Sequence, residues 1–161
     1  LLPYVDAMNI DLKAFNPKYY EKVCGGDVES VLKIIRESAK KTHVEVTTLL
    51  VNDLNDSALE VESIASYIGN LNRDIPLHLS RYFPTYKMDR PATDIDVMVE
   101  SRKIAKKHLN YVYLGNVQGV DSSTYCPKCG ELLVERIGYL TEVRMDSNKC
   151  PKCGYPINMV F

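Results

Sequence analysis

Two hydrophobic patterns alternate along the first 115 residues of the chain. Short apolar segments rich in β-branched or aromatic residues predict four buried strands: 5–12, 44–51, 77–82 and 111–114. Apolar residues at helical spacing, with charge on the opposite face, predict three intervening helices, which end near residues 41, 71 and 108. The strands start at intervals of 39, 33 and 34 residues, and this steady alternation is typical of parallel βα units.

Polar residues mark where each helix is expected to begin. Asp27 is the expected N-cap of the first helix, which starts at Val28, and either Asn55 or Asp56 is the expected cap of the second. Thr93 and Asp96 have the spacing of a capping box before the third helix. One side of the second helix is expected to hold its apolar residues: Leu59, Ile64, Ala65, Ile68 and Leu71.

Four parallel strands fit either a small open sheet or half of a larger barrel, since a complete eight-stranded barrel needs about 250 residues. After Gly115 the pattern changes to Gly, Asn, Gln and Ser, which indicates a linker. We therefore expect an α/β domain over residues 1–119 and a small second domain over residues 120–161.

Composition and charge narrow the class of protein. The balance of 45% hydrophobic and 25% charged residues is ordinary for a soluble globular chain. A net charge of −1 argues against a protein that coats nucleic acid or an anionic membrane. Apolar runs such as 46–51 are far shorter than the ~20 residues of a membrane helix, and no secretion signal opens the chain. The expected location is the cytoplasm.

Four of the five cysteines lie in the last 36 residues, in two near-identical Cys-Pro-Lys-Cys-Gly motifs. The ligands Cys126 and Cys129 are separated from Cys150 and Cys153 by 20 residues, the spacing of a tetrahedral Cys₄ zinc ribbon. The glycine after each motif permits a left-handed backbone, which lets amide N–H groups face sulfur. Two disulfides and a rubredoxin-type iron site are the alternatives. A closed Cys₄ site is structural, so the ribbon does not by itself name a reaction.

A resemblance to a known family rests on the strand ends taken together with the ribbon. One strand ends in Asp11-Leu-Lys13, another continues as His-Leu-Ser-Arg-Tyr-Phe-Pro-Thr-Tyr-Lys-Met over 78–88, and the two cysteine motifs follow. In this order the chain resembles radical SAM enzymes related to pyruvate formate-lyase activating enzyme, above all the radical SAM member of the AmmeMemoRadiSam group.

The resemblance implies a partial (βα)₆ barrel that binds a 4Fe–4S cluster through a CxxxCxxC loop. The reduced cluster cleaves S-adenosylmethionine, and the 5′-deoxyadenosyl radical abstracts a hydrogen atom from a substrate, which in activating enzymes is a protein glycine. No CxxxCxxC occurs in this sequence, and Cys24 alone cannot replace three clustered thiolates. We therefore interpret the chain as the C-terminal half of such an enzyme, inactive by itself, with S-adenosylmethionine and the cluster expected only in the full-length parent.

Asp11 and Lys13 are the first candidates for the S-adenosylmethionine site, because the carboxyl ends of barrel strands build the active site and the resemblance gives this pair such a role. His78 and Ser80 share one face of their strand and are further candidates for cofactor binding. The alternatives are a salt-bridged pair at a strand end for Asp11 and Lys13, and a satisfied core histidine for His78.

The partner expected for the parent enzyme is a protein substrate. An alternative function is a zinc-ribbon module on an α/β scaffold that binds another protein. Basic and acidic residues balance around the cysteine motifs, so nucleic acid is not expected as a partner. The strand at 5–12 would be unpaired along one edge in a half-barrel, and this edge predicts a homodimer.

Overall fold

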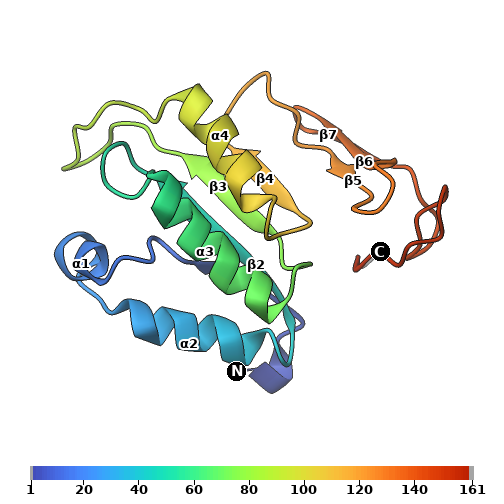
Figure 1. Cartoon of the computed structure of the whole chain (residues 1–161), viewed down its shortest axis with the longest axis horizontal. Helices are drawn as coiled ribbons and strands as arrows, with labels where there is room; N and C mark the ends of the chain where they lie inside the picture. Colours follow the sequence, from blue (N-terminus) through green and yellow to red (C-terminus); the bar gives the residue numbers. More distant parts are fainter. Residues whose placement is uncertain (1, 160–161) are drawn as a thin grey trace. The chain divides into compact units, whose positions relative to one another are not determined.

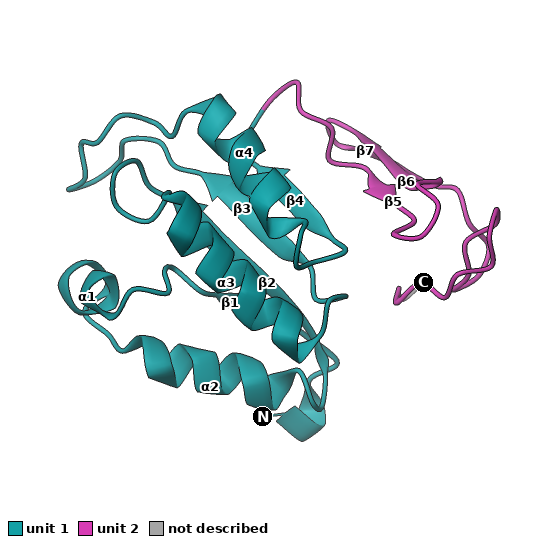
Figure 2. Cartoon of the chain, viewed as in Figure 1, with its two compact units in different colours: residues 1–117 teal, residues 118–161 magenta. Residues whose placement is uncertain are grey.

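The computed structural model describes residues 2–159, which form two compact units (Figure 2). The first unit ends at Val117, and the second begins at Gln118. The boundary expected from the sequence lies two residues later, after residue 119.

The first unit alternates strands with helices, as the hydrophobic pattern predicts. Its elements in chain order are a 3₁₀ turn (Leu2–Tyr4), β1 (Ala7–Asp11), α1 (Pro17–Tyr19), a π-helical turn (Tyr20–Cys24), α2 (Val28–Ser38), β2 (His43–Leu50), α3 (Ala58–Leu71), β3 (Leu77–Arg81), α4 (Ile95–Ala105) and β4 (Val112–Gly115). All four predicted strands are confirmed, with ends that shift by one or two residues. The helices α2 and α4 each end three residues before their predicted ends.

The strands form one parallel sheet in the order β1-β2-β3-β4. Each strand pairs with the next one along the chain, as in one sector of a (βα) barrel. The expectation of a partial α/β barrel with parallel strands is therefore confirmed, and β1 and β4 are the two edges of the sheet.

The helices α2, α3 and α4 lie on one face of this sheet (Figure 1). Burial along β2 alternates strictly, and the residues that face the helices are buried: Val44, Val46, Thr48 and Leu50. The other residues of β2 are half-buried. We call the side of the sheet opposite the helices the open face. It corresponds to the inner face of a barrel.

The start of α3 differs from the expectation. Ser57 caps the helix, and its hydroxyl accepts a hydrogen bond from the Glu60 N–H. Asn55, one of the two expected caps, is buried and bonds backbone groups of Lys13, Leu49 and Val51 instead. Leu59 is 77% exposed, because it lies nearly opposite the buried stripe that contains Val61 and Ile64. The expectation that it packs with that stripe is wrong.

The start of α4 also differs from the expected capping box. Asp94 is the N-cap and accepts a hydrogen bond from Asp96 N–H at 2.7 Å. Thr93 is fully buried instead, and its hydroxyl donates to the Leu50 carbonyl and accepts from the Tyr82 N–H. The Thr93 side chain therefore joins the loop before α4 to the sheet.

The second unit is a small antiparallel sheet with its own core. The strands β5 (Thr124–Tyr125), β6 (Leu132–Ile137) and β7 (Leu140–Val143) pair in that order. Its core residues include two of the cysteines: Cys126, Leu133, Val134, Met145, Cys150 and Ile157. So small a core cannot stabilise a unit of this size without a further cross-link.

Candidate functional site

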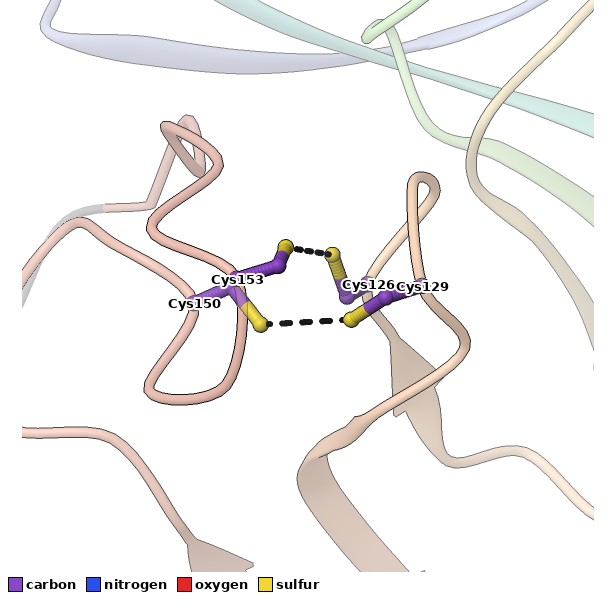
Figure 3. A group of neighbouring side chains, drawn as sticks. All are labelled: Cys126, Cys129, Cys150 and Cys153. Atoms are coloured by element: carbon purple, nitrogen blue, oxygen red, sulfur yellow. Dashed lines mark hydrogen bonds between the residues drawn. The ribbon is translucent and has the colours of Figure 1, made fainter.

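The four clustered cysteines lie in two turns whose thiols converge (Figure 3). All four sulfur atoms lie within 4.8 Å of one another. The Sγ atoms of Cys126 and Cys153 are 3.7 Å apart, and those of Cys129 and Cys150 are 3.6 Å apart. The short approaches therefore join one turn to the other.

These separations fit four sulfurs around one metal ion. A tetrahedron with metal–sulfur bonds of about 2.3 Å has edges of about 3.8 Å, whereas a disulfide needs about 2 Å. All four thiols are free in the structure. The donor set and its geometry therefore suit a metal that prefers tetrahedral thiolate coordination, as zinc does.

The two cysteine turns have the same backbone conformation. Gly130 and Gly154 both adopt positive φ angles, 74° and 69°, which confirms the left-handed conformation expected after each motif. The N–H of each glycine donates to the carbonyl of the first cysteine in its turn at 2.9 Å. An ion pair between Lys152 and Glu131, 3.2 Å long, joins the two turns.

The protonation of the thiols favours a bound cation. Burial raises the pKa of Cys150, but hydrogen bonds from the N–H groups of Cys153 and Lys152 and from the thiols of Cys126 and Cys129 together lower it further, to about 7. The backbone hydrogen bond at Glu131 lowers the pKa of Cys129. Burial and the other three thiols disfavour a second negative charge there and outweigh this effect, so the pKa is raised to about 12. A divalent cation would remove this repulsion and hold all four thiolates together.

A second candidate site is a polar row across the open face of the sheet. The strand registers place four side chains level with one another, one from each strand: Asp11, Thr47, His78 and Tyr113. Adjacent strands lie about 4.8 Å apart, so Asp11 and His78 are separated by about 10 Å. Two of the residues proposed from the sequence thus share one row.

Asp11 and Lys13 form an ion pair at 3.0 Å, and both side chains are more than one third exposed. The pair is therefore salt-bridged, as the alternative interpretation from the sequence has it. Because both side chains are still exposed, they can also contact a ligand. The Lys13 N–H donates to the Tyr20 hydroxyl at 2.9 Å, and the Lys13 carbonyl accepts from Asn55 at 2.6 Å. The backbone that carries Lys13 is therefore held on two sides.

Asn55 is a residue that sequence reasoning missed as a positioning group. It is 1% exposed and bonds three backbone groups: Val51 N–H, Leu49 carbonyl and Lys13 carbonyl. It thereby ties the loop after β1 to the end of β2. The only sequence signal is its place in a polar loop after a strand, and that signal favours a helix cap equally.

Ser80 lies two residues beyond His78 on the open face, opposite Gly115 of β4. A Cβ at Gly115 would lie 3.0 Å from the Ser80 hydroxyl oxygen, so glycine leaves the room that this side chain occupies. His78 itself is half-buried and bonds Glu45 of β2 at 2.7 Å. The alternative interpretation places His78 in the core. The side chain does have a hydrogen-bond partner, but it is only half-buried.

Glu45 is the second residue that sequence reasoning missed. His43, Glu45 and Thr47 alternate with buried residues in β2, which puts them on the open face. The alternation was visible in the sequence, but the partner of Glu45 on β3 was not. The hydrogen bond from His78 lowers the pKa of Glu45 below its usual range, although burial raises it.

Cys24 belongs to neither set of candidate residues. It ends the π-helical turn and is exposed. Burial of its sulfur raises the pKa of the thiol, with Lys13 opposing the effect. A raised pKa leaves the thiol protonated at neutral pH, which does not suit a nucleophile.

No family model matches the chain. An uncharacterized protein of Methanocaldococcus jannaschii is 40% identical over 165 residues, which cover 98% of this chain and 49% of that protein. A protein of Methanosarcina acetivorans named probable GTP 3′,8-cyclase is 24% identical over 83% of this chain and 45% of its own length. The chain thus spans about half the length of the curated relatives it matches.

A solved structure shares the fold. It is a domain of the pyruvate-formate lyase-activating enzyme from Bacteroides vulgatus, with a TM-score of 0.63 and 21% identity, covering 71% of this chain and 70% of that one. The fold is thus that of an α/β protein with a parallel, partly barrel-like sheet. It is the fold found in a domain of a pyruvate formate-lyase activating enzyme, and the resemblance inferred from the sequence is confirmed at this level.

Within residues 2–159, no helix combines the length and the apolar character that crossing a bilayer requires.

Proposed function

We propose that the first unit is the C-terminal part of a radical SAM barrel and that its open face lines the reaction chamber. One observation carries this proposal: the parallel sheet has helices on one face and a row of polar, half-exposed side chains on the other. An ordinary parallel sheet buries both faces under helices, whereas a barrel places a ligand at the carboxyl ends of its strands. The shared fold and the cyclase-like relative support the same interpretation.

In this proposal Asp11 and Lys13 bind S-adenosylmethionine at the carboxyl end of β1. The lysine ammonium pairs with the methionyl carboxylate or a ribose oxygen, and the aspartate accepts from a hydroxyl or amine. The two side chains are already paired and more than one third exposed, so the ligand exchanges for an existing contact and needs no buried charge. His78 and Ser80 extend the same surface onto β3.

The residues of this chain do not fit a 4Fe–4S cluster. Four of its five cysteines converge in the second unit, and Cys24 has no neighbouring thiol among the described residues. No step through a cluster can therefore be assigned to these residues. The chain alone is inactive in this proposal, and the parent enzyme would act on a protein substrate as a glycyl-radical activating enzyme does.

The decisive experiment compares this chain with a protein extended upstream to include a CxxxCxxC loop. Both are reconstituted anaerobically with iron and sulfide, reduced, and supplied with S-adenosylmethionine. We expect 5′-deoxyadenosine from the extended protein only, and its Asp11→Asn and Lys13→Met variants should bind S-adenosylmethionine less tightly. Turnover from the 161-residue chain alone, or an extended protein that binds a cluster and never cleaves S-adenosylmethionine, would refute the proposal.

For the second unit we propose one structural zinc ion bound by the four clustered cysteines. The support is the tetrahedral fit of the sulfur separations and the small size of the core. Iron fits four thiolates as well, so metal analysis must distinguish the two. Zinc absent from protein purified without chelator, with iron in its place, would overturn this assignment.

A second candidate function is protein binding by the ribbon. The β6–β7 hairpin exposes three large apolar side chains around its turn, Ile137, Tyr139 and Leu140. Exposed apolar residues in one cluster favour a protein partner over a nucleic acid. In the extended enzyme, a Tyr139→Ser, Leu140→Ser variant that still forms 5′-deoxyadenosine but no longer activates its protein substrate would support this function; full activation would exclude it.

A further inference from the structure

Glu45 and His78 form a carboxylate–imidazole pair in the middle of the open face. His78 lies level with Thr47 in the register between β2 and β3, so Glu45 is its diagonal neighbour. The Glu45 Oε2 atom lies 2.7 Å from His78 Nε2, and the Oε1 atom lies 3.4 Å from His43 Nε2. Both carboxylate oxygens thus face histidines, and the closer contact is the one to His78.

A third strand fixes the plane of the His78 ring. The ring of Tyr113, on β4, stacks on His78 with centroids 5.4 Å apart and an interplanar angle of 28°. Contacts from β2 and from β4 therefore hold the imidazole in one orientation. Such restraint from two neighbouring elements is typical of side chains that position a ligand.

We propose that Glu45 is a positioning residue that holds His78 as the Nε2–H tautomer and turns its Nδ1 toward the chamber as a hydrogen-bond acceptor. A carboxylate only accepts hydrogen bonds, so the atom 2.7 Å from it must carry the proton. In a neutral imidazole the other nitrogen then lacks a proton.

The charges around His78 support this assignment. The titratable groups that contact it are Glu45 on β2, which also contacts His43, and Tyr113 on β4, while Asp11 lies in the same row about 10 Å away. The lowered pKa of Glu45 keeps its carboxylate ionised at neutral pH, so it stays an acceptor.

The consequence is a preference about the ligand. An acceptor nitrogen requires a ligand group that donates, such as a hydroxyl or an N–H. An anionic oxygen at the same place would face a lone pair on Nδ1 and the Glu45 charge behind it, and is disfavoured. This part rests on the proposed function, which assigns the open face to the ligand.

The test is the tautomer of His78, read from the ¹⁵N shifts of the imidazole nitrogens in the full chain at a pH where the ring is neutral. In the unsubstituted chain we expect a protonated Nε2 and an unprotonated Nδ1. Glu45→Gln keeps an acceptor oxygen and should preserve this pattern. Glu45→Ala removes the acceptor, and the two nitrogens should move toward an averaged, mixed-tautomer pattern.

Two controls accompany the measurement. His43→Ala removes the longer contact to Glu45 and should leave the His78 pattern unchanged. His108, which lies near Glu62 at 3.6 Å in another part of the unit, should give the same signals in every variant and thereby reports intact folding. An Nδ1–H tautomer in the unsubstituted chain, or an unchanged pattern in Glu45→Ala with His108 intact, would overturn the assignment. No S-adenosylmethionine is present, so this result is independent of the 5′-deoxyadenosine assay that tests the proposed function.

Discussion

Asn55 joins three backbone groups of distant segments, and its replacement by alanine should cost the first unit much of its stability. The amide oxygen accepts from Val51 N–H at 2.7 Å, and the amide nitrogen donates to the carbonyls of Lys13 at 2.6 Å and Leu49 at 2.9 Å. The side chain is 1% exposed, so water cannot replace these contacts in the folded state. At about 1 kcal/mol for each hydrogen bond, the loss is about 3 kcal/mol.

A second variant separates shape from hydrogen bonding. Asn55→Asp keeps the acceptor for Val51 N–H but turns a carboxylate oxygen toward the carbonyls of Lys13 and Leu49. This carboxylate oxygen would then face two carbonyl oxygens, and none of the three carries a proton to share. We therefore expect Asn55→Asp to be no more stable than Asn55→Ala, although aspartate is closer to asparagine in shape.

Thermal unfolding followed by circular dichroism at 222 nm measures the effect, because the helices of the described residues lie in the first unit. A loss of about 3 kcal/mol lowers the Tm of a unit of this size by about 10 °C. Asn52→Ala is the matched control: Asn52 donates only to the neighbouring Asp53 side chain, and its loss should stay within about 0.5 kcal/mol. Equal Tm values for Asn55→Ala and Asn52→Ala would refute the positioning role of Asn55.

Three further predictions concern the metal, the pH dependence and the sheet edge. Protein purified without chelator should contain about one zinc per chain, and chelation should unfold residues 118–161 while the circular dichroism of the first unit persists; a chelated ribbon with unchanged NMR signals would contradict this. The pKa of Glu45 is lowered in the folded state, so its pairing stabilises the chain above the usual pKa of a glutamate and this contribution disappears as the pH falls through the lowered value. Because the side chain is 37% exposed, the stability difference from Glu45→Gln should be below about 1 kcal/mol at neutral pH and vanish once the pH is well below the lowered pKa, whereas a difference that persists in acid would exclude the pairing. The edge of β1 should mediate a homodimer in solution, measurable by sedimentation, and a monomer at high concentration with freely exchanging β1 amides would count against it.

Several features could be predicted from the sequence because they depend on neighbours along the chain. Strand and helix periodicity, the Asp27 cap and the left-handed glycines after each cysteine pair are local, and the structure bears them out. The parallel order follows from the alternation itself, since a strand–helix–strand unit returns the chain in the same direction. The clustered cysteines are equally local, because each turn holds its two thiols within four residues.

Polar contacts between distant segments required the tertiary structure. The sequence shows that Glu45 shares a face with Thr47, but only the register of β2 against β3 brings it to His78, 33 residues away. Asn55 and Thr93 are residue types that often cap helices. Both are buried instead, and each bonds a backbone carbonyl more than 40 residues away in the sequence. The partners of a helix cap are its near neighbours in the sequence. The partners of Asn55 and Thr93 depend instead on the hydrophobic packing that brings distant segments together. The sequence therefore determines the elements and the two cysteine turns, and the packing of helices against one face of the sheet decides which polar groups meet in the interior and on the other face.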